Sequence, residues 1–211
     1  MITRRARWAS GLVCLVSAVT MIGAGAMNKA VDQPAQVGEP APDFTLTDLE
    51  GREHTLSEYT KAGNIVVLEW FNPTCPFVRK HYREDTMTMV KMQEELKAEK
   101  IVWLRINSAH EGHVTAGIEL NKDTAEDWGI TTPILRDLEG TVGRAYGAKR
   151  TPEMYVIAAS GVLEYHGAID NNPDSVSPGE KNYVRAALSE VLAGEECSKP
   201  TSKAYGCSVK Y

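Results

Sequence analysis

Hydrophobic positions along the chain change their spacing several times, and each spacing predicts a different element. Residues 41–56 alternate apolar and polar types on both sides of the turn sequence Asp48-Leu49-Glu50-Gly51, which predicts a β-hairpin. Ser57 follows at a position where it would cap a short helix. Residues 65–71 and 101–107 are almost continuously apolar, as expected for strands that are covered on both faces.

Helical spacings separate and follow these two strands. Apolar side chains from Val78 to Leu96 recur at three- and four-residue intervals, which predicts one long amphipathic helix ending near Lys100. A second helix is expected within residues 108–132, and residues 133–169 predict a short strand, a short helix and two strands joined by a turn. A last helix over residues 183–192 ends at Gly194. This order predicts a single three-layer α/β domain, with a mixed central sheet flanked by helices.

The first 26 residues have the pattern of an export signal. Three arginines near the start precede an apolar run, and the small residues Ala24-Gly25-Ala26 form a cleavage site. A retained membrane anchor is the alternative, although the apolar run is short for a span. We therefore expect a signal peptide at 1–26, a flexible lead-in at 27–38, a domain at 39–194, a polar tail at 195–211, and a periplasmic or secreted protein.

Charge excludes one class of partner. The chain carries 23 basic and 28 acidic residues, and removal of the signal would leave 20 basic residues and a net charge near −8. Nucleic-acid surfaces need clustered lysine and arginine, so no nucleic-acid partner is expected. A chain of 211 residues with 43% apolar types is long enough to bury a core.

Three cysteines remain once the signal and its Cys14 are removed: Cys75, Cys197 and Cys207. An odd number in an oxidising compartment means that at least one thiol is free, transiently paired or shared between molecules. No cysteine–histidine spacing is of the zinc type, and His110 with His113 is a weak metal candidate. The glycines at 140, 143 and 147 lack a nucleotide-binding pattern, so neither a metal nor a cofactor is expected.

Cys75 stands where an apolar strand turns into a helix, in the stretch WFNPTCPFVRK. Pro76 suits the first helical position, and the N–H groups of a first turn would favour the thiolate form of the cysteine. Arg79 follows one turn later and adds positive charge. The alternative is an inert buried cysteine. The position at the carboxyl end of a strand favours a reactive thiol.

The combination of WFNPTCP with the later RTPEMYVI resembles the thioredoxin-like superfamily. The nearest branch contains the alkyl hydroperoxide reductase and thiol-specific antioxidant proteins, and the resemblance spans residues 40–192. The ending TSKAYGCSVKY is similar to the tails of exported redoxins. The resemblance implies a thioredoxin-like fold and a redox cysteine at position 75.

Four further roles follow from this resemblance. Pro152 would be the cis-proline that faces the redox cysteine, and Thr151 would offer backbone groups to a bound disulfide partner. Glu69 would be the buried acid that exchanges protons with the thiol, because burial disfavours its ionised form. An ion pair of Glu69 with Arg79 or Lys80 is the alternative.

The chain also departs from its relatives near Cys75. Val78 replaces the second cysteine of the thioredoxin motif, so no local disulfide can form. Peroxiredoxins place threonine or serine where this chain has Asn72, with Thr74 nearby. Asn72 can still donate a hydrogen bond, but the replacement weakens the prediction of a peroxidase.

The predicted function is an exported thiol-based oxidoreductase in which Cys75 attacks a protein disulfide or a peroxide and a thiol donor returns the electrons. The alternative is a non-enzymatic binding module in which Cys75 holds a partner or a soft metal such as Cu(I). Cys197 and Cys207 close a short loop, so a disulfide between them is the favoured pairing. A link from Cys75 to Cys207 would instead make the tail a resolving arm, and a link to Cys197 stays open.

Overall fold

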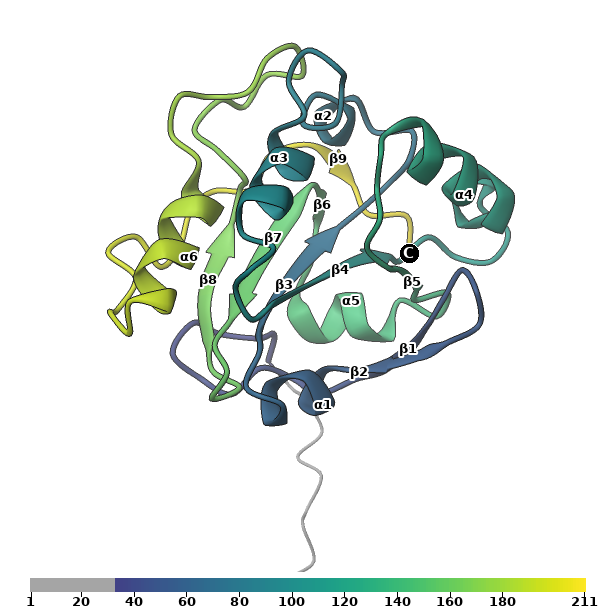
Figure 1. Cartoon of the computed structure of the whole chain (residues 1–211). Coiled ribbons are helices and arrows are strands. Elements are labelled where there is room, and N and C mark those ends of the chain that lie inside the picture. The colour runs from purple at the N-terminus through teal and green to yellow at the C-terminus, as the bar shows by residue number, and fades with distance from the viewer. Residues whose placement is uncertain (1–32) are drawn as a thin grey trace, which may run out of the picture. The chain divides into compact units, whose positions relative to one another are not determined.

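A seven-stranded mixed sheet forms the centre of the computed structural model, which describes residues 33–211 (Figure 1). The strand order is β2-β1-β5-β4-β3-β7-β8. The neighbours β3, β4 and β5 are parallel, whereas β7, β8, β1 and β2 join by antiparallel pairing. The strands are β1 (Thr45–Asp48), β2 (Glu53–Thr55), β3 (Ile65–Trp70), β4 (Ile101–Asn107), β5 (Ile134–Arg136), β7 (Glu153–Ile157) and β8 (Leu163–Gly167).

Successive side chains of β3 point to opposite faces of the sheet, and all of them are buried. Helices therefore cover both faces of the sheet. Val67 belongs to the core cluster that includes α2 (Pro76–Arg79), α3 (Thr88–Glu95) and α6 (Tyr183–Leu192). Val66 and Leu68 belong to the opposite cluster, which includes α1 (Leu56–Lys61) and α5 (Thr141–Tyr146). The remaining helices are α4 (Ile118–Asp127) and the 3₁₀ turn η1 (Val114–Ala116). The prediction of a three-layer α/β domain is confirmed.

The predicted long helix after Cys75 is wrong, because α2 ends at Arg79 and α3 starts only at Thr88. Lys80 and His81 follow α2 and are fully buried, with polar contacts to the segment after β8. Met87 has a φ of 46°, which a continuous helix does not allow. Long-range contacts of two polar residues therefore interrupt a segment whose apolar spacing is helical throughout.

The start of the domain also differs from the sequence prediction in two details. Thr55, not Ser57, is the N-cap of α1, and the Ser57 N–H donates to Asp43 Oδ1 at 2.9 Å. The predicted signal peptide at 1–26 lies outside the described residues. Within the described part of the lead-in, the N–H groups of Ala35 and Gly38 donate to Ala145 and Leu163 carbonyls, so these residues are attached to the domain.

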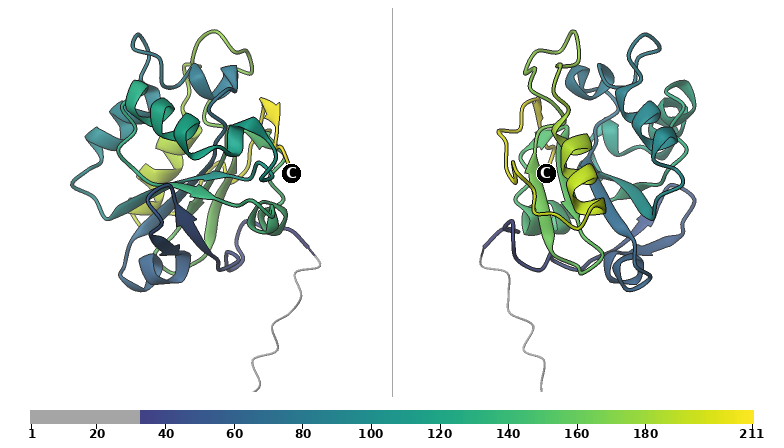
Figure 2. Two further views of the ribbon diagram at one scale, coloured as in Figure 1. Left: turned by 90° about the vertical axis from the view of Figure 1, so that its right-hand side faces the viewer. Right: turned by 60° about the vertical axis from the view of Figure 1, so that its left-hand side comes forward.

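The tail after α6 returns across the molecule instead of leaving it (Figures 1 and 2). It ends in β9 (Cys207–Ser208), which pairs antiparallel with β6 (Arg150–Thr151) just before β7. Backbone hydrogen bonds join Pro200 to His166, Val209 to Lys149 and Lys210 to His110. The tail is therefore a structural part of the domain. Within residues 33–211, no helix is long and apolar enough to cross a membrane.

Candidate active site around Cys75

Cys75 occupies the turn between β3 and α2, and the preceding loop is held by its own side chains. Asn72 Oδ1 accepts hydrogen bonds from both the N–H and the hydroxyl of Thr74, each at 2.9 Å. The Cys75 carbonyl accepts from the N–H groups of Val78 and Arg79, which starts α2. Only 1% of the Cys75 surface is exposed. Asn72 and Thr74 thus shape the loop that positions the thiol.

The sulfur of Cys207 lies against the sulfur of Cys75. The two Sγ atoms are 2.8 Å apart, and Cys75 Sγ is also 3.0 Å from the Thr151 carbonyl oxygen. Cys207 reaches this place because it is the register partner of Thr151 in the β6–β9 pair. The Thr151–Pro152 peptide bond is cis, as the resemblance implied. The tail therefore fills the place beside Thr151 that the resemblance assigns to a disulfide partner.

Gly206 makes this close approach of the tail possible. A Cβ atom at this position would lie 2.1 Å from the Thr151 carbonyl oxygen, and the φ of Gly206 is 122°. Any side chain would therefore push β9 away from β6. The glycine in YGCSVKY is required by the contact between the tail and the residue before Pro152.

The predicted disulfide between Cys197 and Cys207 is not the arrangement that the structure shows. All three described cysteines are free thiols, and Cys197 Sγ lies 3.9 Å from the Ala187 carbonyl oxygen on α6. Burial raises the pKa of the Cys197 thiol to about 11. The prediction relied on the short separation of the two cysteines, whereas strand pairing with β6 brings Cys207 to Cys75.

Tyr205, two residues before Cys207, anchors the tail in a buried polar cluster. Its hydroxyl donates to Asp170 Oδ1 at 2.5 Å and lies 3.1 Å from His81 Nε2. Lys80 Nζ sits 4.4 Å from the centre of the Tyr205 ring and donates to the carbonyls of Asn172 and Asp174. The cluster joins the end of α2, the segment after β8 and the tail, so it anchors the tail two residues before Cys207.

Burial controls the protonation of several groups around the sulfurs. It lowers the pKa of Lys80, and it lowers the pKa of His81 to about 4, so His81 is neutral near pH 7. Burial and the hydrogen bond with Cys75 raise the pKa of the Cys207 thiol to about 12. Cys207 therefore stays protonated near neutral pH in this closed arrangement, and the candidate for first attack is Cys75, which stands at the N-cap of α2.

Glu69 is buried on β3 and has a partner that differs from the predicted ones. Its Oε2 accepts a hydrogen bond from the Tyr82 hydroxyl and lies 3.5 Å from Arg105 Nε, while Arg105 Nε donates to the Tyr82 hydroxyl at 3.0 Å. Arg105 is the register partner of Glu69 on β4. Burial raises the pKa of Glu69, and its Oε1 has no hydrogen-bond partner.

The alternative prediction, an ion pair of Glu69 with Arg79 or Lys80, therefore named the wrong cation, because the cation beside Glu69 is Arg105. Arg79 is exposed and makes no ion pair among residues 33–211, and Lys80 is used by the Tyr205 cluster. Arg105 was missed although it stands alone as a charge in the apolar run 101–107. A single charged residue in a predicted buried strand, in a chain that also carries a predicted buried acid at Glu69, was the sequence feature that could have identified Arg105.

Comparison with known proteins identifies the family of this chain. The model of the AhpC/TSA family matches residues 37–166, which is more than half of the chain. The chain belongs to the AhpC/TSA family. Its relatives include the thiol-disulfide oxidoreductase ResA of Geobacillus thermodenitrificans, which is 32% identical over 128 residues covering 61% of this chain and 67% of ResA. The prediction of an oxidoreductase agrees with this family and this relative.

Solved structures bear out the thioredoxin-like fold. An uncharacterized conserved protein from Geobacillus kaustophilus superposes with a TM-score of 0.74 and 27% identity, covering 83% of this chain and 92% of that one. A putative thiol:disulfide interchange protein DsbE from Chlorobium tepidum superposes with a TM-score of 0.56 and 21% identity, covering 76% and 97%. Within the AhpC/TSA family, this chain therefore has the predicted fold.

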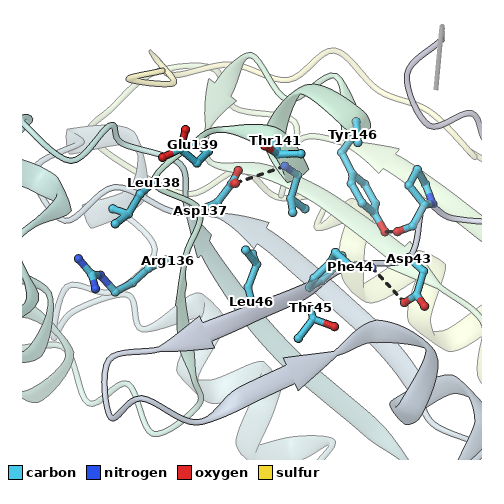
Figure 3. A pocket seen from close by; sticks show the side chains of 13 residues that line it. Asp43, Phe44, Thr45, Leu46, Arg136, Asp137, Leu138, Glu139, Thr141 and Tyr146 are labelled. Atoms are coloured by element: carbon cyan, nitrogen blue, oxygen red, sulfur yellow. Dashed lines mark hydrogen bonds between the residues drawn. The ribbon is translucent and has the colours of Figure 1, made fainter. Parts of the chain in front are cut away.

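Two other regions of this AhpC/TSA protein were considered as sites. His113 Nδ1 lies 2.8 Å from the Thr115 hydroxyl at the start of η1, and no group of three or more potential metal ligands occurs in residues 33–211. A cavity of about 490 Å³ lies between β1 and α5, lined by Phe44, Leu46 and Tyr146 among others (Figure 3). Its lining includes none of the predicted site residues.

Proposed function

We propose that the protein is a thiol–disulfide oxidoreductase in which Cys75 attacks a substrate disulfide and Cys207 resolves the product. The observation that carries this proposal is the 2.8 Å separation of the two sulfurs at the end of a paired strand. Two free thiols this close need little movement to reach the disulfide bond length of about 2.05 Å. The tail thus supplies the second cysteine that Val78 replaces in the local motif.

The reaction proceeds by two exchanges. The Cys75 thiolate attacks one sulfur of the substrate disulfide, so that a mixed disulfide forms and the other substrate sulfur leaves as a thiolate. Cys207 then loses its proton and attacks Cys75 Sγ, which releases the second substrate thiolate and forms the Cys75–Cys207 disulfide. The substrate gains two electrons and two protons, and an external dithiol or two thiols restore the reduced enzyme.

The buried position of Cys75 requires movement of the tail during this cycle. β9 covers the sulfur, so a substrate reaches it only after β9 separates from β6. The pair has only two residues on each strand, so few backbone hydrogen bonds need to break for it to open. Opening admits the substrate beside Thr151, and reclosure returns Cys207 to the mixed disulfide.

Glu69 is the proposed proton acceptor for these exchanges. Burial holds its pKa above the usual value of 4.5, and Oε1 is free to accept a proton because Tyr82 and Arg105 both act on Oε2. Val67 on β3 and Phe71, which directly follows β3, belong to the core cluster that contains Cys75. A carboxyl with these properties can exchange protons with thiols near neutral pH through ordered water.

Reaction with a peroxide is a second use of the same pair. Cys75 would reduce the peroxide and become a sulfenic acid, and condensation with Cys207 would release water and give the same disulfide. Asn72 stands where peroxiredoxins carry threonine or serine, and its Oδ1 accepts from Thr74, so only its Nδ2 is left to donate to a peroxide. We place either reaction in the periplasm or outside the cell, on the strength of the predicted signal.

Stopped-flow mixing of reduced protein with a model protein disulfide, and separately with hydrogen peroxide, tests the proposal. We expect the model disulfide to react faster, with the loss of two thiols per protein molecule. Cys197→Ser should match the wild type, because Cys197 is no part of the pair. Loss of only one thiol, or equal rates for wild type and Cys75→Ser, would contradict the proposed function.

A further inference from the structure

A hollow of about 630 Å³ opens beside the sulfur pair. Its walls come from the segment after β8, the start of α6 and the tail, with Arg150, Tyr205 and Gly206 among the lining residues. Gly206 precedes Cys207, and Arg150 precedes Thr151, whose carbonyl contacts Cys75 Sγ. The hollow therefore borders both strands of the β6–β9 pair. Its volume is within the range of roughly 300–1,000 Å³ that is typical of small-molecule sites.

The hollow is positively charged although the chain is acidic. Arg150, Lys199 and Lys203 line it, all three are exposed, and none of them forms an ion pair among residues 33–211. Lys199 Nζ lies 4.5 Å from the centre of the Tyr183 ring, which holds it at the wall.

Among the described residues that line the hollow, Asp170 is the one carboxylate. Asp170 is 2% exposed, and its oxygens already accept from the Tyr205 hydroxyl and from the N–H groups of Asn172 and Gly179. Lys80 Nζ is 3.7 Å away and balances its charge. Three exposed cations are therefore left facing the space next to Cys207, which suits a ligand with carboxylate groups.

We infer that the hollow binds the reductant of the proposed reaction, and that this reductant is a small thiol carrying carboxylates. The inference rests on the proposed function, because it needs the Cys75–Cys207 disulfide. Gly206 lines the hollow and is the neighbour of Cys207, which is partly exposed whereas Cys75 is buried, so Cys207 Sγ is the sulfur that a thiol in the hollow would attack.

The exchange balances with two donor molecules. The first donor thiolate attacks Cys207 Sγ, which forms a mixed disulfide and breaks the bond to Cys75, leaving Cys75 as a thiolate. A second donor thiolate attacks the donor sulfur of the mixed disulfide and releases Cys207. The two donors leave joined as one disulfide, and the protons of the two donor thiols pass to Cys75 and Cys207.

Reduction of the isolated oxidised protein by three thiols of different charge tests the inference. The thiols are mercaptosuccinate, 2-mercaptoethanol and cysteamine, and each rate is divided by the rate of the same thiol with a small uncharged disulfide. We expect mercaptosuccinate to be favoured over cysteamine by roughly tenfold at low salt, the scale of a few exposed charge pairs. The preference should shrink in about 0.5 M salt, where screening shortens the reach of charge.

Lys199→Gln with Lys203→Gln should remove most of this preference, and Lys61→Gln with Lys100→Gln makes the same change in net charge far from the tail. The charge of Lys210 also lowers the pKa of Cys207, but Lys210 is unchanged in both variants. A difference in thiol preference between the two variants is therefore caused by the lysines of the hollow. An equal preference in both variants, or no preference in the wild type, would overturn the inference while leaving the proposed function intact. Failure to isolate a Cys75–Cys207 disulfide would remove both.

Discussion

Replacing Cys207 with serine is expected to stop the reaction at a mixed disulfide between Cys75 and the substrate. The attack by Cys75 needs no second cysteine, but its product is released only when a nearby thiol attacks it. In the wild type that thiol is held 2.8 Å from Cys75, so the resolving step is intramolecular. We expect turnover of the model disulfide to fall at least ~100-fold, since an external thiol lacks this effective concentration. Mass spectrometry of the intact protein should find close to one substrate adduct per molecule.

Two single substitutions serve as controls for the trapped adduct. Cys75→Ser should give no adduct, because the sulfur proposed to attack the substrate is then absent. Cys197→Ser should turn over like the wild type, since its sulfur contacts α6 and not the pair. An adduct on Cys207 in the Cys75→Ser variant would reverse the proposed order of attack.

Arg105→Ala is expected to cost about 3–5 kcal/mol of unfolding free energy, the range for breaking a buried charged pair. Arg105 is 1% exposed and is the cation beside Glu69, so its removal leaves a buried carboxyl with the Tyr82 hydroxyl alone. Burial already raises the pKa of Glu69 above 4.5, and loss of the arginine raises it further. The native state then binds a proton that the unfolded state releases, so the loss should be smallest near pH 4.5 and grow as the pH rises above that value. Urea unfolding at several pH values measures this dependence.

Adding Glu69→Gln to Arg105→Ala should recover part of the stability above pH 4.5, because no unpaired carboxyl is then left beside Tyr82. Arg83→Ala is the matched control, since Arg83 pairs with Asp85 at the surface and should cost less than about 1 kcal/mol. A loss of similar size in both single variants would show that Glu69 and Arg105 do not form the buried pair described.

The main strands of the central sheet and their order along the chain could be predicted because their signals are local. The run IVVLEWF became β3 and IVWLRIN became β4, both with the expected burial. The hairpin around Asp48 and the pair of strands around Ser160 also follow from short turn sequences. Local spacing failed at Lys80 and His81, where burial of polar side chains against Asp170 and Tyr205 ended the helix. Such contacts join residues about 90 to 125 positions apart, and no periodicity records them.

The active site also combines residues that local motifs predicted with residues that only long-range contacts bring in. Cys75, Glu69 and Pro152 belong to short motifs, so each could be named from the sequence, whereas the partners of these residues could not. Arg105 meets Glu69 through the β3–β4 register, and Cys207 meets Cys75 through the β6–β9 register. Chain length alone allowed the tail to reach any part of the domain, so the sequence could not decide between Cys75 and Cys197 as the partner of Cys207.

Peptide mapping of the oxidised protein by mass spectrometry, without prior reduction, tests the central claim most directly. Protein oxidised with one equivalent of a small disulfide and alkylated at low pH should yield a peptide pair linking Cys75 to Cys207, with Cys197 alkylated. The structure favours this link because the two sulfurs are already in contact, while Cys197 lies at α6. A dominant link between Cys197 and Cys207, with Cys75 alkylated, would contradict the account and make the tail disulfide a structural staple.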